Sequence, residues 1–258
     1  MRPYQAGDEI RNMDWRVTAR TGKPHTKLFR EERERPALLL IDLRPAMFFA
    51  TRGALKAVVA AECAALLAWS VVHQGDRVGG MLFDDGADGA MRQVIRPGRG
   101  KRPVMRLLGE VVHHPHWQQR RMERGDAQQR LRDALQRALH AARAGSLLIV
   151  VSDGRGLDAE CALLLRQALK HHQLLFVAIH DPFEAALPDA GMLPLFDGRR
   201  VQLLASSDRA LREQHQAQFA ARQQRLCDLN QLPGFFHIPC ATTDVPLTAL
   251  QRVLGVVR

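Results

Sequence analysis

Three apolar runs, each ending in or near an aspartate, do most to constrain how this chain folds. They cover Ala37 to Ile41, Ser146 to Ser152 and Gln173 to His180, and helical patterns lie between them. Apolar runs of this length are typical of strands that are buried on both faces. Strands that alternate with helices indicate βαβ units, so the sequence predicts a mainly parallel sheet with helices on both faces.

Shorter patterns complete the predicted architecture. Strands at 77–83 and 91–96, joined by Asp-Gly steps, predict one antiparallel edge strand, and strands at 193–196 and 201–204 predict a small β insertion at about 182–206. Helices are expected at 51–73, 128–144, 157–172, 208–229 and 246–253. We therefore expect residues 1–35 to pack as an accessory on one α/β domain formed by residues 36–258.

The composition is that of a soluble globular protein. Of 258 residues, 46% are hydrophobic and 25% are charged, which is enough apolar material for a substantial core. The first residues lack the pattern of a signal peptide, which predicts a cytoplasmic protein. The most apolar helical stretch, residues 54–72, carries Lys56 and Glu62, so we expect it to cover the sheet and not to span a membrane.

The net charge of +10 is concentrated in one region. Residues 92–132 hold eleven Lys and Arg side chains against three acidic ones. Such a region can bind nucleic acid through phosphate contacts, but Trp117 is its only aromatic residue available for stacking on bases. A solvated basic face or an acidic protein partner is favoured, and nucleic-acid binding by this region is the alternative.

Two carboxylates are expected at one edge of the sheet. Asp42 ends the first core strand and Asp153 follows the second, and ligands of parallel sheets bind at the carboxyl ends of the strands. Two carboxylates that approach each other there repel unless a positive charge lies between them.

Other motifs give weaker signals. Gly154, Gly156 and Ala159 imitate a dinucleotide-binding fingerprint, but Asp153 would face the pyrophosphate and the strand is not the first of the sheet. The stretch "HHPHW", residues 113–117, is interpreted as a solvated loop. No activated nucleophile, cofactor motif or metal-ligand spacing is present, so the sequence predicts neither an enzyme nor a cofactor.

Several stretches together resemble a known bacterial family. They are "YQAGDEIRNMDWRVTARTGK", "EERERPALLLIDLRPAM", "VSDGRGLD" and "HDPFEAALPDAG". The chain resembles the domain-of-unknown-function family 58, whose core is a von Willebrand factor A-like domain. The resemblance implies a Rossmann-like three-layer sandwich. It also implies a metal-ion-dependent adhesion site, built from D-x-S-x-S, a later threonine and a final aspartate.

This sequence departs from the implied adhesion site at every hydroxyl. Asp42 and Asp153 match its aspartates, but Arg44 and Ala46 stand where the two serines belong, and no Ser or Thr lies between Ser70 and Ser146. Our hypothesis is that the Arg44 guanidinium replaces the metal and pairs with Asp42, Asp153 or both. Two alternatives remain open: Asp42 caps the following helix while Arg44 points into solvent, or the site binds a cation.

The resemblance also implies a function. Family members are thought to be non-catalytic protein-interaction modules that work with MoxR-type AAA+ ATPases in maturing or remodelling other proteins. The N-terminal motif combines Asp8, Arg11, Asp14, Trp15 and Arg16. This motif is either a structural clasp, in which aspartates cap turns and Trp15 packs on the core, or a docking surface for a partner.

Overall fold

The structure is a computed structural model that describes residues 2–5, 10–26, 35–85, 94–118, 126–196 and 200–255. The chain divides into two compact units, Met1–Glu34 and Arg35–Arg258. This division lies within one residue of the boundary expected from the sequence. The expectation that the smaller unit packs on the larger one stays a prediction.

The N-terminal unit is a short helix beside a two-stranded ribbon. Its elements are β1 (Arg2–Pro3), η1 (Ile10–Asn12), α1 (Trp15–Thr21) and β2 (His25–Thr26), and the two strands pair antiparallel. The carboxylate of Asp14 accepts a hydrogen bond from the backbone N–H of Val17 at 3.2 Å and so caps α1. Gly22, at φ 68°, ends the helix in the left-handed conformation.

A six-stranded sheet forms the centre of the larger unit. Its strands are β3 (Ala37–Asp42), β4 (Val78–Phe83), β5 (Ile95–Gly98), β6 (Leu147–Ser152), β7 (Gln173–His180) and β10 (Phe235–Ala241). They lie in the order β10-β7-β6-β3-β4-β5, and only β5, at the edge, runs antiparallel to its neighbour. The predicted mainly parallel sheet with one antiparallel edge strand is confirmed. Residues 86–93, which include most of the predicted turn before β5, lie outside the described residues.

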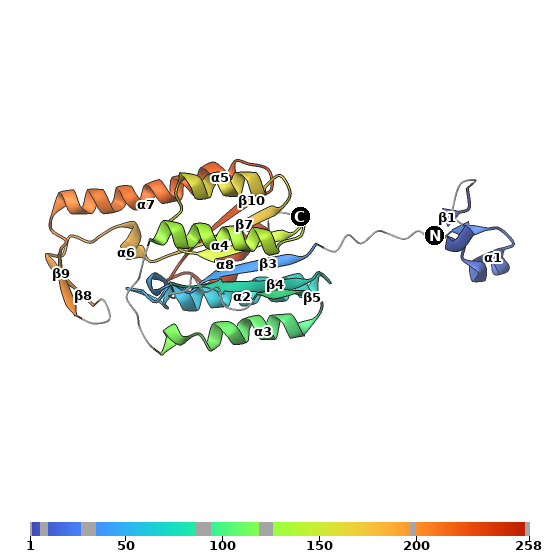
Figure 1. Cartoon of the computed structure of the whole chain (residues 1–258), viewed down its shortest axis with the longest axis horizontal. Coiled ribbons are helices and arrows are strands. Elements are labelled where there is room, and N and C mark those ends of the chain that lie inside the picture. Colours follow the sequence, from blue (N-terminus) through green and yellow to red (C-terminus); the bar gives the residue numbers. More distant parts are fainter. Residues whose placement is uncertain are drawn as a thin grey trace. The chain divides into compact units, whose positions relative to one another are not determined.

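Helices cover both faces of this sheet (Figure 1). One face packs against α2 (Lys56–His73), α3 (Lys101–Val112) and α8 (Pro246–Leu254), the other against α4 (Ala127–Ala141), α5 (Ala159–Ala168) and α7 (Arg209–Asn230). Side chains of β3 alternate between the two layers, with Leu39 and Ile41 toward the first and Leu38 and Leu40 toward the second. This alternation explains why a strand buried on both faces reads as an unbroken apolar run.

Two helices differ from the sequence-based expectation. Helix α2 begins at Lys56 instead of residue 51, because the chain first makes an irregular loop after β3. Helix α3 was not predicted, because the three basic residues in its first half obscured the buried stripe of Val104, Leu107 and Val111. Among the described residues, α2 alone is long and apolar enough to cross a membrane, and half of that stretch is buried against the sheet and its neighbours.

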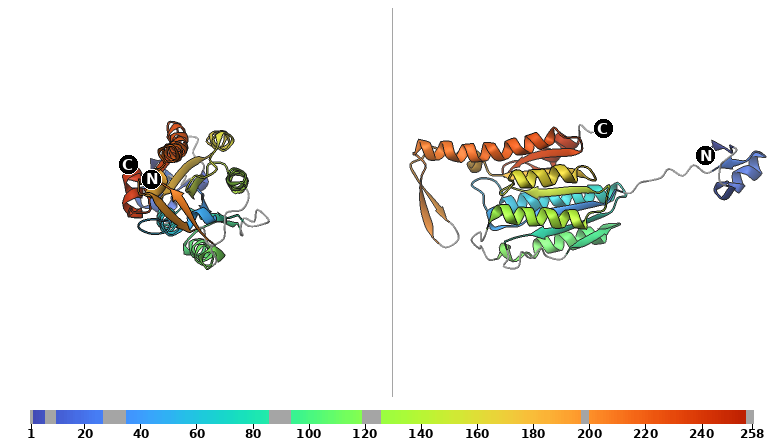
Figure 2. Two further views of the ribbon diagram at one scale, coloured as in Figure 1. Left: turned by 90° about the vertical axis from the view of Figure 1, so that its left-hand side faces the viewer. Right: turned by 45° about the horizontal axis from the view of Figure 1, so that its top comes forward.

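A small β hairpin is inserted after β7. The short helix α6 (Pro182–Ala185) leads into β8 (Met192–Phe196) and β9 (Val201–Ala205), which pair antiparallel as a separate sheet. Figure 2 shows this hairpin at the end of α7, apart from the central sheet. The predicted insertion is therefore confirmed.

Candidate functional site

The site lies where the strand order reverses. From β3 the chain first adds β4 on one side, and it later adds β6 on the other side, so the ends of β3 and β6 flank the switch point of the sheet. Asp42 is the last residue of β3, and Asp153 directly follows β6. Both side chains are buried at the carboxyl ends of these strands.

Arg44 folds back onto Asp42. Its Nη2 atom lies 2.7 Å from Oδ2 of Asp42 and its Nε atom lies 3.0 Å from Oδ1, which is a bidentate pairing. The same Nη2 lies 3.5 Å from Oδ1 of Asp153. Only 1% of Arg44 is exposed, so the ion pair that we hypothesised is present and the alternative with Arg44 in solvent is wrong.

Backbone carbonyl groups complete the surroundings of Arg44. Its Nη1 atom donates to the carbonyl oxygen of Ala127 at 3.2 Å, and Nη2 donates to that of Arg155 at 3.0 Å. The guanidinium carbon lies 5.2 Å from the ring centroid of Phe83. A planar group with five fixed donors is therefore held on several sides, which the point charge of a lysine could not reproduce.

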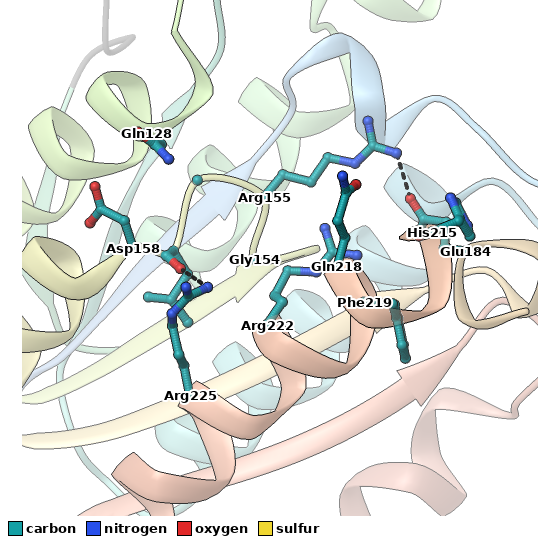
Figure 3. Close-up of a pocket in the computed structure, with 12 residues that line it drawn as sticks. Gln128, Gly154, Arg155, Asp158, Glu184, His215, Gln218, Phe219, Arg222 and Arg225 are labelled. Carbon is teal, nitrogen blue, oxygen red and sulfur yellow. Dashed lines mark hydrogen bonds and ion pairs between the residues drawn. The ribbon is translucent and has the colours of Figure 1, made fainter. Parts of the chain in front are cut away.

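Lys56 is a second buried cation, which was not predicted from the sequence. Its Nζ atom donates to Asp153 at 2.9 Å and to Glu184 at 2.7 Å, and the lysine is fully buried. Arg155 joins the same group, with its Nη2 atom 2.9 Å from Glu184 (Figure 3). Its position at the start of a mostly apolar helix could have indicated a buried ion pair, because lysine is almost never fully buried unless it is paired.

The charges of this network balance. Arg44, Lys56 and Arg155 supply three positive charges, and the three carboxylates belong to Asp42, Asp153 and Glu184. Burial raises the pKa of Asp153, but the attraction of Lys56, then of Arg44 and Arg155, outweighs this and holds its pKa well below the ordinary range. We call these six residues the buried ion network.

Asp181 positions one end of the network. Its carboxylate accepts hydrogen bonds from the hydroxyl of Thr242, at 2.8 Å, and from the backbone N–H and hydroxyl of Thr51. It also caps α6, while the backbone N–H of Asp181 donates a hydrogen bond to Oε2 of Glu184 at 3.1 Å. This capping box fixes Glu184 so that its other oxygen meets Lys56.

The side chains at this site are not suited to be ligands of a divalent cation. Ser152 donates to Oδ2 of Asp42 at 2.6 Å, and every other carboxylate oxygen of Asp42 and Asp153 also accepts a hydrogen bond. Mg²⁺ requires an octahedron of oxygen ligands, whereas the serine positions of the motif hold Arg44 and Ala46. Within the described residues, no cluster of three or more His, Cys, Asp or Glu side chains is arranged to hold a metal.

Two of the three histidines of "HHPHW" are buried, so the prediction of a solvated loop was wrong for His114 and His116, while His113 is exposed. His116 lies in η3 (Pro115–Trp117) and is 4% exposed, and the preceding His114 is 1% exposed. His114 Nε2 lies 3.0 Å from Asp84, and His116 Nδ1 lies 2.9 Å from the carbonyl oxygen of Leu43. Proline interrupts the helical pattern, as expected, but the turn folds inward beneath the loop after β3.

The two glycines of the sequence that imitates a dinucleotide-binding fingerprint allow the backbone conformation of this loop. Gly154 and Gly156 have φ values of 69° and 87°, which favour glycine. A Cβ atom on Gly156 would overlap the backbone of Ala127, at the start of α4. Close packing of this loop accounts for the second glycine without a nucleotide.

The suggested docking residues of the N-terminal motif are placed in part. Asp14 is buried as the cap of α1, which fits the clasp, while Trp15 and Arg16 are exposed in their own unit. Asp8 and the side chain of Arg11 lie outside what the structure describes. The choice between clasp and docking surface stays open to experiment.

Comparisons with known proteins agree with this architecture. A model of the family described as "Protein of unknown function DUF58" matches residues 1–225. Uncharacterized proteins of Mycobacterium tuberculosis and Mycobacterium bovis are 30% identical over 213 residues, which are 82% of this chain and 64% of each relative. The chain thus spans 64% of the length of these relatives.

Solved structures share the fold at low sequence identity. The conserved hypothetical protein BatB of Bacteroides thetaiotaomicron matches with a TM-score of 0.50 and 13% identity, over 86% of this chain and 98% of that one. The pilus adhesin SpaC of Lactobacillus rhamnosus GG matches with a TM-score of 0.52 and 10% identity, over 91% of this chain and 32% of that one. Because the family model spans residues 1–225, this protein belongs to the DUF58 family.

Proposed function

We propose that this protein is a non-catalytic protein-interaction module whose adhesion site holds fixed ion pairs in place of a metal. The observation that carries the proposal is the bidentate pair of Arg44 and Asp42 at the switch point of the sheet. A guanidinium that is already bound to the motif's aspartate leaves no room for a cation in that position. Contacts made at this site are then insensitive to chelators.

The buried ion network gives this site rigidity and one accessible charge. Its members Arg44, Lys56 and Asp153 are at most 4% exposed, whereas the side chain of Arg155 is 39% exposed. A partner would therefore meet Arg155 and the surrounding loops, while the inner pairs hold those loops in place. This arrangement favours binding over catalysis, because the accessible charge of the network is a guanidinium, which stays protonated and is not a general base.

The partner is proposed from the family resemblance. Members of the family are typically encoded beside MoxR-type AAA+ ATPases, and we propose that this chain works with such an ATPase in the cytoplasm to mature or remodel a client protein. The pilus adhesin among the structural neighbours shares only the fold. This chain spans 64% of the length of its longer relatives, so the activity of those whole proteins is not part of this proposal.

Calorimetric titration with Mg²⁺ and Mn²⁺ tests the metal part of the proposal. We expect no binding heat at millimolar metal, while a von Willebrand A domain with an intact D-x-S-x-S motif, used as a positive control, binds. Micromolar binding by the wild type that disappears in Asp42→Asn would refute the replacement of the metal by Arg44.

Affinity capture from the native organism tests the interaction. We expect the tagged protein to retain an AAA+ ATPase and to release it in Arg155→Gln, but not in Arg166→Gln, which changes an exposed arginine of α5. Capture without added nucleotide should be equal with and without EDTA. An ATPase that is never enriched, or that is lost on chelation, contradicts the proposal.

One observation supports the alternative, which is nucleic-acid binding by residues 92–132. Helix α3 presents Lys101, Arg102 and Arg106 on its exposed face. Phosphate contacts of this kind weaken steeply with salt. We expect DNA to be released completely at 200 mM salt in a mobility-shift experiment, and retention there would favour the alternative.

A further inference from the structure

A polar pocket of about 480 Å³ opens beside the buried ion network. The loop after β6 forms one wall and helix α7 forms the opposite wall (Figure 3). Three arginines face this space, Arg155 from the loop and Arg222 and Arg225 from α7. Neither the family nor the ion network assigns a role to the two arginines of α7.

Arg222 is the unusual member of this group. Its stem lies over Gly154, where a Cβ atom would be 3.5 Å from Cδ of the arginine, and its guanidinium carbon lies 5.4 Å from the ring centroid of Phe219. Its Nε atom is buried, and its guanidinium has no hydrogen-bond or ion-pair partner among the described residues. Burial lowers the pKa of Arg222. Arg222 as a whole is partly exposed and feels the attraction of Asp153 and Glu184, but a buried Nε atom that makes no hydrogen bond calls for an explanation.

The carboxylates in the pocket wall are already in use. Glu184 is paired with Lys56 and Arg155, and Asp158 accepts a hydrogen bond from Arg132 at 2.9 Å. Arg225, nearer the rim, donates to the carbonyl oxygen of Leu157 at 3.2 Å, which leaves its positive charge uncompensated. The pocket therefore carries an excess of positive charge that the described part of the chain does not neutralise.

We propose that this pocket binds the carboxylate of an acidic side chain on a protein partner, with Arg222 as the bidentate donor and Arg225 at the rim. This inference rests on the proposed function and names the chemistry of the partner. A singly charged carboxylate matches the planar fork of one guanidinium. The carboxylates of Asp158 and Glu184 in the wall would repel a multiply charged phosphate group, and the lining contains no Lys, Ser or Thr.

Apolar surface near the pocket favours a protein as the source of the carboxylate. Strand β9 leads into α7, and one face of the β8–β9 hairpin exposes Met192, Phe196, Val201 and Leu203, each by 55% to 64%. Such an apolar face rimmed by polar residues is typical of an interaction surface. Arg222 lies about 20 Å along α7 from the end that follows β9, so a partner with an acidic residue at that distance from apolar residues would contact both features.

Nuclear magnetic resonance of the arginine Nε–Hε groups tests this assignment with capped hexaglutamate as the probe and capped hexaglutamine as the control. We expect hexaglutamate to shift the Arg222 resonance in the full chain, whereas hexaglutamine does not. Arg222→Gln should weaken hexaglutamate binding at least tenfold, and Arg166→Gln should leave it unchanged. Arg222→Lys, which keeps the charge but loses the planar fork, should give an intermediate affinity and serves if the glutamine variant does not fold.

Several outcomes overturn the assignment. These are no binding of hexaglutamate by the wild type, equal binding by Arg222→Gln, or displacement of hexaglutamate by inorganic phosphate at lower concentration than by free glutamate. Capture of the AAA+ ATPase separates this failure from that of the proposed function. If Arg222→Gln still captures the ATPase, the interaction module stands and only the pocket loses its role.

Discussion

The Nζ atom of Lys56 lies 2.9 Å from Oδ2 of Asp153, although 97 positions separate the two residues in the chain. The contact joins the first turn of α2 to the loop after β6, across the carboxyl end of β3. Lys56 thereby connects the pair formed by Arg44 and Asp42 to Glu184 and the capping box of α6. The top of the sheet is held by charges that come from four separate segments.

Removing Arg44 should strongly destabilise the protein. Arg44→Met leaves Asp42 buried with only its hydrogen bonds from Ser152 and the backbone, so we expect a loss of about 3–5 kcal/mol in the free energy of unfolding. Urea denaturation measures this loss. Arg52→Met, at an exposed position, should change stability by less than about 0.5 kcal/mol.

A double variant isolates the ion pair. In Asp42→Leu with Arg44→Met neither charge is left unpaired, so part of the stability lost in the single variants should return. A cost below about 1 kcal/mol for Arg44→Met would mean that water reaches Asp42 and that the pair is not truly buried.

Acid should weaken the network through Asp153. Because its folded pKa lies below the ordinary value of 3.8, its contribution is fully present above that value and is lost as the pH falls further. We expect Asp153→Asn to be destabilised at pH 7 and to approach the wild type between pH 4 and pH 2. The exposed Asp228→Asn is the control, and a stability difference independent of pH would contradict this origin of the effect.

A second pH effect should come from His237 in β10. Burial, and then the neighbouring His180, lowers its pKa from 6.5 to about 4. In this pH range the imidazole is protonated in the unfolded chain but neutral in the folded protein. Stability therefore falls as the pH drops from about 6.5 to 4. Because His237 is partly exposed and solvent screens its charge, we expect the free energy of unfolding to fall by about 1–2 kcal/mol over this pH range.

Unfolding curves for His237→Gln at several pH values measure this contribution. The variant should lose less stability than the wild type between pH 7 and pH 4.5, and the exposed His171→Gln controls for removal of a surface imidazole. If His237→Gln and the wild type lose stability in parallel, His237 is not the group responsible.

Gly156 should not tolerate a side chain. In Gly156→Ala the residue would keep a φ near 87°, and its Cβ atom would overlap the backbone of Ala127, so we expect a loss of more than about 2 kcal/mol. Gly109→Ala is the matched control, because Gly109 lies in α3 with open space around it and should gain up to about 1 kcal/mol. Equal melting temperatures for the two variants would show that the loop after β6 can shift.

The sequence predicted the parallel sheet because its signals are local. Strands such as Ala37–Asp42 are buried on both faces, so they must be apolar throughout, and the helices between them carry a periodic apolar stripe. Helix α3 escaped prediction because three basic residues and Pro103 fall in its first half, and only Val104, Leu107 and Val111 are buried. The same strand pattern also predicted that Asp42 and Asp153, which follow two parallel strands, lie at one edge of the sheet.

The partners of those carboxylates were decided by the tertiary structure. Arg44 was found from the sequence because it stands two residues from Asp42, where a departure from a known motif marks it. Glu184 and Arg222 lie far away in the chain. The place of Lys56 in an apolar helix indicates a buried pair, but nothing local shows which carboxylates it meets. The sequence by itself determined the layers and the residue types at the sheet edge. Which charges neutralise each other depends on distances across the fold, because electrostatic energy follows separation in space and burial, not separation in sequence.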